Sequence, residues 1–229
     1  MISYRKSAII VGVLFIIGDI AGVLSYVVTG GLLDGPDALT KIAASQNHVV
    51  LGALLVLVMG LALAMVPVLM FPVFKKYNEV LALGCVVFRG ALETVAYMAC
   101  AGAWLLLVEL SREHAQAASP GAPYFHTFST LLAGSTTAWL TSIVFSLGSL
   151  MFYYLFYQSR LIPRWLSVWG LVGAVLYLAW PLLALFGHGF GILMLPLAVA
   201  EIVLAIWLIV RGFGARALAS VAATGEGAA

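Results

Sequence analysis

Six long apolar runs dominate the sequence, and each is close to the length that an α-helix needs to cross a membrane. A hydrocarbon core of about 30 Å takes about 20 residues of helix. The runs cover residues 7–28, 48–74, 80–108, 136–157, 166–186 and 192–210. We therefore expect an all-α, polytopic membrane protein whose fold is a bundle of six transmembrane helices.

The composition excludes most other classes of protein. Of the 229 residues, 64% are hydrophobic and 9% are charged, whereas about a quarter of the residues of a soluble domain are charged. Nucleic-acid binding would need clustered Lys and Arg, so we expect no nucleic-acid partner. We expect one transmembrane domain over residues 1–213, in contact with the lipid bilayer, and a short flexible tail over residues 214–229.

Lys and Arg lie mainly in alternate turns between the runs, and such positive turns stay on the cytoplasmic side of a membrane. Eight of the eleven cations follow this rule: Arg5, Lys6, Lys75, Lys76, Arg160, Arg164, Arg211 and Arg216. The pattern predicts a multi-pass protein of the cell membrane with both termini in the cytoplasm. The apolar segment Tyr124–Ser135 would make the fourth span too long, so it either lies along the outer surface or extends that span.

Three motifs occur in a distinctive order. The turn after the fourth run reads SRLIPRWLSVWG over residues 159–170, and the last run ends with EIVLAIWLIVRGF over residues 201–213. Before the third run, YNE at 77–79 leads into LALG at 81–84 and FR at 88–89.

With these motifs the chain resembles, over about residues 5–213, a bacterial family of six-helix inner-membrane proteins catalogued as domain of unknown function 4386. The resemblance implies no activity, substrate or cofactor. It implies an arginine and a glutamate close together on the third helix, which are Arg89 and Glu93 in this chain.

Charged residues lie well inside three of the runs. A charge in the hydrocarbon core costs about 2.5–3.5 kcal/mol, so each must face protein or water and find a partner. At 1.5 Å of helix per residue, the charges lie about 13–20 Å from the cytoplasmic ends of their runs. They are Asp19, Arg89, Glu93 and Glu201. We expect one polar cluster near the middle of the membrane, as a ligand or proton site.

Arg89 and Glu93 are four residues apart, on one helix face, and we expect them to form an ion pair. Asp19 and Glu201 would then remain. Three acids and one base sum to a charge of −2, which is unfavourable in a medium of low dielectric constant. Either one or two of the acids hold a proton, or a cation or cationic ligand binds there.

Hydroxyl groups surround the charged positions and are expected to support them. Four serines form one stripe on the fourth run, and their hydroxyls could bond across to the acids or back to carbonyls of their own helix. The supporting polar residues are Ser142, Ser146, Ser149, Thr94 and Tyr97, and Ser135 begins the stripe.

Helix packing and bending are indicated by small residues and prolines. Gly18 and Gly22 have the four-residue spacing that lets two helices approach closely. Pro196 and Pro181 are expected to bend the sixth and fifth helices and free backbone carbonyls, those of the sixth near Glu201.

Aromatic residues near the ends of the spans are expected to form interface belts. The aromatic residues that end the fourth run belong to this prediction: Tyr153, Tyr154, Phe156 and Tyr157.

Motifs of enzymes and metal sites are absent from the sequence. It contains no nucleophile elbow, phosphate loop, dinucleotide fingerprint, His-x-x-x-His or Cys-x-x-Cys. The four histidines lie in separate places on the expected outer side: His48, His114, His126 and His188. No catalytic residue, metal ligand or cofactor is therefore assigned.

Three functions remain open. The chain could bind or transport a proton, a cation or a small amphiphile at the charged cluster. It could instead be an accessory or scaffold subunit that docks another membrane protein, or, with least support, an intramembrane enzyme. The charges could also serve only to hold the helices in register. Two kinds of partner are possible, a small hydrophobic ligand and a membrane protein subunit. The molecule that remains bound on purification would distinguish them.

Overall fold

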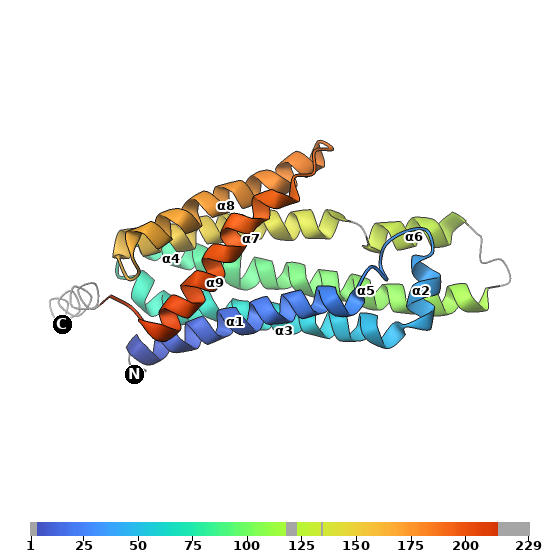
Figure 1. Cartoon of the computed structure of the whole chain (residues 1–229), viewed down its shortest axis with the longest axis horizontal. Coiled ribbons are helices and arrows are strands. Elements are labelled where there is room, and N and C mark those ends of the chain that lie inside the picture. The colour runs from blue at the N-terminus through green and yellow to red at the C-terminus, as the bar shows by residue number, and fades with distance from the viewer. Residues whose placement is uncertain (1–3, 118–122, 134, 215–229) are drawn as a thin grey trace.

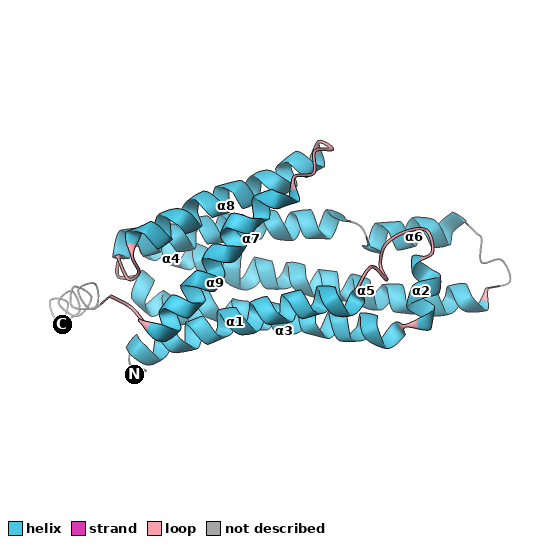
Figure 2. Ribbon diagram, in the orientation of Figure 1, coloured by secondary structure: helices cyan, strands magenta, loops and turns pink. Residues whose placement is uncertain are grey.

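The computed structural model describes residues 4–117, 123–133 and 135–214, and these residues form helices joined by loops, with no strand (Figure 2). Six helical segments are long and apolar enough to cross a membrane, which confirms the predicted all-α, six-helix fold. The elements are α1 (Tyr4–Thr29), α2 (Ala38–Ala44), α3 (Gln46–Phe74), α4 (Glu79–Cys85), the π-helix η1 (Val86–Leu92), α5 (Glu93–Gln116), α6 (Pro123–Ala133), α7 (Ser135–Ser159), α8 (Arg164–Leu185), the 3₁₀-helix η2 (Gly191–Met194) and α9 (Leu195–Val210).

The spans form a closed ring. Helix α1 packs against α3, α3 packs against η1 and α5, and the third span packs against α7. Helix α8 lies between α7 and α9, and α9 returns to α1 and closes the ring. In Figure 1, α9 crosses α1 near the two termini and diverges from it toward the opposite end. Side chains that point to the ring axis therefore come from several spans.

The two ends of the described chain lie together. Arg5 donates hydrogen bonds from Nη2 to the carbonyl oxygens of Ile209 and Val210, at 2.9 and 3.1 Å. Both termini are thus at one end of the ring, as six spans require (Figure 1). We call this the inner end and the opposite one the outer end. That the inner end faces the cytoplasm stays a prediction.

A small cap covers the outer end. The sequence did not decide the position of the apolar segment before the fourth span. Most of this segment forms helix α6, which packs against α5 beside α2 (Figure 1). Phe125 of α6 is buried in one apolar cluster with Ile42 of α2 and Leu107 of α5. The segment therefore forms part of the cap that joins α2, α5 and α6.

The main apolar core joins all six spans and extends from the inner end as far as Leu197, near the outer start of α9. Phe74 at the end of α3 packs edge-to-face against Phe152 and Phe156 of α7, with ring centres 5.5 and 5.1 Å apart. In the outer half, two smaller apolar clusters join α3 to α5, one of them with α2 and α6, and α7, α8 and α9 contribute nothing to either. The larger outer cluster therefore holds the cap of α2 and α6 to α3 and α5.

The predicted interface belt at the end of α7 is wrong for two of its four residues. Tyr154 and Tyr157 are exposed as expected, but Tyr153 and Phe156 are completely buried in the core. The reason is the helical period, because positions 153 and 156 lie on the face of α7 that points into the ring.

The two prolines that were expected to bend helices lie at different places in their helices. Pro181 lies inside α8, whereas Pro196 lies in the first turn of α9, directly after η2. A proline at the start of a helix has no internal hydrogen bond to break, so the prediction of a kink near Glu201 is wrong. Pro67 and Pro72 lie inside α3 instead.

Glycines allow close helix contacts at several places. Gly18 and Gly22 face Leu63 and Met59 of α3, which is the close packing that the spacing predicts. One close contact involves Arg89 and Gly148 of α7. A Cβ atom there would lie 2.9 Å from the Cβ and 3.0 Å from the backbone nitrogen of Arg89.

We predict that Gly148→Ala lowers the free energy of unfolding by about 1–3 kcal/mol, because the backbones of α7 and η1 would have to move apart. Gly102→Ala is the control, since a Cβ atom at Gly102 of α5 would meet nothing within 4 Å. Unfolding in mixed detergent micelles measures both. Equal stability of the two variants would contradict the close contact.

Candidate functional site

The first element of the site is the π-helix η1, which places Arg89 at the ring axis. A π-helical turn is wider than an α-helical turn and is frequent at functional sites. The Thr94 hydroxyl donates a hydrogen bond of 2.5 Å to the carbonyl of Gly90 in this turn. Gly90 itself lies close to Pro67 and Ala64 of α3. The irregular turn is thus held between α3 and α7.

Arg89 is the central residue of the site and is completely buried. Its Nη2 donates to Oε1 of Glu201 on α9, and its Nη1 donates to the hydroxyl of Ser149 on α7. Glu201 is 6% exposed, so the ion pair is almost free of water. One side chain therefore joins three spans around the ring.

Three aromatic rings enclose the guanidinium. Its central carbon lies 5.4, 4.7 and 5.6 Å from the ring centres of Phe15, Phe145 and Phe152. The face of an aromatic ring attracts a cation, most strongly where water is excluded. These rings offset part of the cost of burying the charge, and Phe15 and Phe152 also belong to the main core.

The predicted pairing of Arg89 with Glu93 is wrong. Arg89 forms its ion pair with Glu201, and neither carboxylate oxygen of Glu93 has a hydrogen-bond partner. The spacing of four residues only places both side chains on one face of a helix. Which carboxylate the guanidinium meets is decided by the packing of α9 against the ring.

The acids that remain are therefore Glu93 and Asp19, rather than Asp19 and Glu201. Glu93 is 1% exposed, and Oδ2 of the half-buried Asp19 also lacks a hydrogen-bond partner. Tyr97 lies beside Glu93 on α5, and both acids are within electrostatic range of Arg89 and Glu201. The four predicted charges thus form one cluster, as expected from their depths.

The serines divide between the two roles that the sequence left open. Ser149 accepts the hydrogen bond from Arg89 across the ring, whereas Ser146 donates to the carbonyl of Ser142 on its own helix. All three are buried. The Ser135 side chain lies outside the described residues.

Two tyrosines of the site were missed in the sequence. The hydroxyl of Tyr153 is buried without a hydrogen-bond partner, and Tyr177 of α8 lies beside Ser142. Tyr153 is four residues after Ser149 and so continues the serine stripe, which is the signal that could have identified it. Tyr177 lies in the middle of its span and carries no comparable signal, because no motif or spacing connects it with the charged residues.

The chemistry open to this cluster is the binding of positive charge. Within the described residues, the carboxylates of Glu93 and Asp19 have no counter-ion of their own next to a neutralised ion pair, and hydroxyl groups lie nearby. Among the described residues, no group of three or more His, Cys, Asp or Glu side chains is arranged to hold a metal ion. A proton or a cation with hydrogen-bond donors fits these acceptors.

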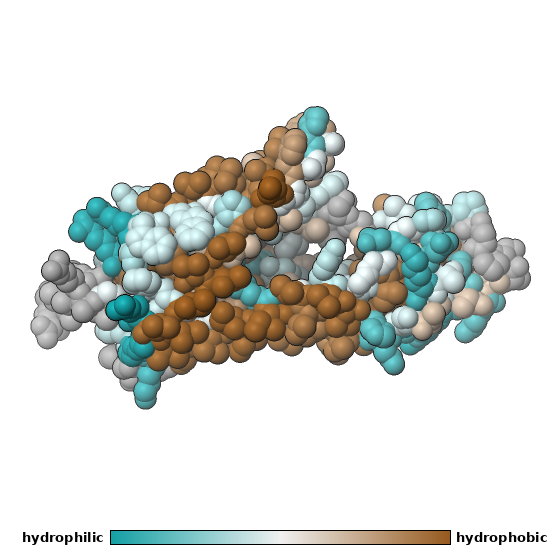
Figure 3. Space-filling view, viewed as in Figure 1, coloured by the Kyte–Doolittle hydropathy of each residue, from teal (hydrophilic) through white to brown (hydrophobic). Residues whose placement is uncertain are grey.

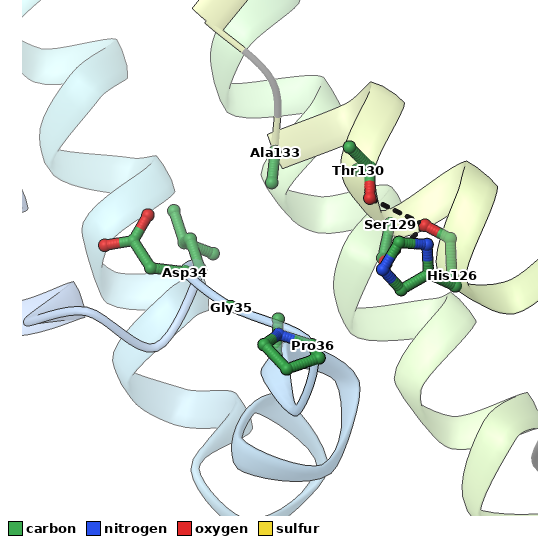
Figure 4. A pocket seen from close by; sticks show the side chains of 9 residues that line it. Asp34, Gly35, Pro36, His126, Ser129, Thr130 and Ala133 are labelled. Carbon is green, nitrogen blue, oxygen red and sulfur yellow. Dashed lines mark hydrogen bonds between the residues drawn. The ribbon is translucent and has the colours of Figure 1, made fainter.

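The outer cap holds a separate cavity, which does not include the cluster. It has a volume of about 460 Å³ and lies between the loop after α1 and helix α6 (Figure 4). Asp34 and Pro36 line one side of this cavity, and His126 and Thr130 line the other. On the face shown in Figure 3, the molecule is hollowed between α9 and the cap.

The helix ring and its buried charges define a polytopic integral membrane protein. A family model described as Domain of unknown function (DUF4386) matches residues 10–212, and the chain belongs to this family. No curated protein and no solved structure matches the chain.

We predict that Glu201→Met or Arg89→Met alone lowers the free energy of unfolding by about 3–5 kcal/mol, because each leaves its partner charge buried and unpaired. The double variant should lose clearly less than the sum of the two. A double-mutant cycle in mixed micelles measures the coupling.

The control cycle uses Glu109 and Arg112, an exposed ion pair of 2.7 Å on α5. Its coupling should stay below about 1 kcal/mol because solvent screens the two charges. Coupling of Arg89 to Glu93 in place of Glu201 would contradict the pairing.

Proposed function

We propose that the protein binds or transports a proton, a cation or a small amphiphile at the mid-membrane cluster of Asp19, Arg89, Glu93 and Glu201, in a bacterial cell membrane. The observation that carries this proposal is the Glu93 carboxylate, which is 1% exposed, lies beside Tyr97 and forms no ion pair within the described residues.

A purely structural role does not account for Glu93. The pair of Arg89 and Glu201, with Ser149, already links three spans and needs no further acid. A buried polar group without a partner costs about 1–3 kcal/mol, and more if it is charged. A chain that keeps Glu93 and Asp19 beside this pair bears a cost that a bound proton or cation would remove.

We place the entrance for a ligand on the outer side of the cluster. The aromatic core around Phe74, Phe152 and Phe156 closes the inner half below the cluster. The outer ends of α8 and α9 are loosely covered, and Phe186 and Ile192 are 82% and 71% exposed. A ligand that enters from this side would pass between these helix ends and the cap of α2 and α6.

The test compares Glu93→Gln with Glu109→Gln, which makes the same change at an exposed position on the same helix. We predict that Glu93→Gln lowers ligand retention or proton flux about tenfold or more, because it removes a charged acceptor worth about 1.5–3 kcal/mol. Native mass spectrometry of protein released from its own membrane measures retention, and a pH-sensitive dye inside liposomes measures flux.

The control variant should match the unaltered chain in both assays. If Glu93→Gln also matches it, the charged cluster is structural and the proposal fails. A polypeptide that stays bound in place of a small molecule would favour the accessory-subunit hypothesis.

A further inference from the structure

A second site, separate from the charged cluster, lies at the inner end. A cavity of about 630 Å³ opens between the turn that joins α7 to α8 and the end of α9. Its polar lining comes from three arginines, and its apolar lining includes Trp207 and Phe213. The three are Arg160, Arg164 and Arg211.

The arginines of this cavity have no acidic partner. None of them forms an ion pair with a carboxylate of the described residues, in which the inner turns hold a single acid, Glu79. Lys75, Lys76, Arg5 and Lys6 lie at the same end of the ring. The cavity is therefore a place of concentrated positive charge.

Backbone contacts fix the walls of the cavity. The amide of Gly214 donates a 2.8 Å hydrogen bond to the carbonyl of Leu161, which ties the segment after α9 to the turn before α8. Gly212 has a φ angle of +73°, and Arg5 packs against it. The cavity is thus formed by ordered elements rather than by free side chains.

An apolar groove continues from the cavity along the exposed side of α9, the side that faces away from the ring axis. It has a volume of about 270 Å³ and shares Trp207 and Arg211 with the cavity. Val203, Ile206 and Val210 form the rest of its lining. From Arg211 to Val203 the groove follows about 12 Å of helix toward the middle of the membrane. Figure 3 shows apolar side chains along α9 and hydrophilic ones at the end where the termini lie.

We propose that this cavity and groove bind one anionic phospholipid. The arginines hold the phosphate of the headgroup by charge-assisted hydrogen bonds, and an acyl chain lies along Val203 and Ile206. Trp207 lies where the cavity meets the groove. This position is near the membrane surface, the depth that tryptophan favours. The proposal does not depend on the function of the charged cluster.

The test titrates the full chain in mild detergent with phosphatidylglycerol, phosphatidylcholine or inorganic phosphate and counts bound molecules by native mass spectrometry. We expect one tightly held phosphatidylglycerol, weaker binding of phosphatidylcholine and a loss of selectivity at high salt. The double variant Arg164→Gln/Arg211→Gln should weaken phosphatidylglycerol binding about thirtyfold.

The double variant Lys75→Gln/Lys76→Gln removes the same charge from the same end outside the cavity, and it should bind phosphatidylglycerol as the unaltered chain does. Arg164→Lys/Arg211→Lys keeps the charge and should retain most of the binding. Equal binding of both lipids by the unaltered chain, or equal losses in the arginine and lysine double variants, would overturn the proposal. Displacement of the lipid by inorganic phosphate would assign the cavity to free phosphate and overturn the lipid assignment.

Discussion

The structure depends on one buried interaction, the ion pair between Arg89 and Glu201. A guanidinium in the middle of a membrane needs a counter-ion, hydrogen-bond acceptors and little exposure to lipid at the same time. Glu201 of α9 supplies the charge, Ser149 of α7 supplies a further acceptor, and the ring of helices excludes lipid. Arg89, Glu201 and Ser149 come from three different spans. The interaction can therefore form only when the spans have closed into a ring.

The pair also determines which acids of the cluster remain without a counter-ion. Once Arg89 is committed to Glu201, Glu93 and Asp19 have no internal partner on their buried oxygens. The main apolar core packs around the ion pair and includes Phe15 and Phe152, whose rings face the guanidinium. At the inner end, three arginines of the cavity form no ion pair within the described residues.

Much of this fold was predictable from the sequence, and the limits have physical causes. The apolar runs gave the six spans, because backbone groups in lipid must be satisfied within a helix. Residue counts from the span ends placed Asp19, Arg89, Glu93 and Glu201 at one depth, and they do form one cluster. The partner of Arg89 was not predictable, because spacing defines a face of one helix and says nothing of the next helix in the ring. Pro196 was misinterpreted because its effect depends on where the helix begins.

The most direct test of the central pairing is a distance measurement in lipid bilayers. Solid-state NMR on protein labelled with ¹⁵N in arginine and ¹³C in the glutamate carboxyls reports which carboxyl lies next to a guanidinium nitrogen. The account predicts a strong dipolar coupling for a buried arginine, lost in Glu201→Gln and kept in Glu93→Gln. A coupling that survives in Glu201→Gln and disappears in Glu93→Gln would contradict it.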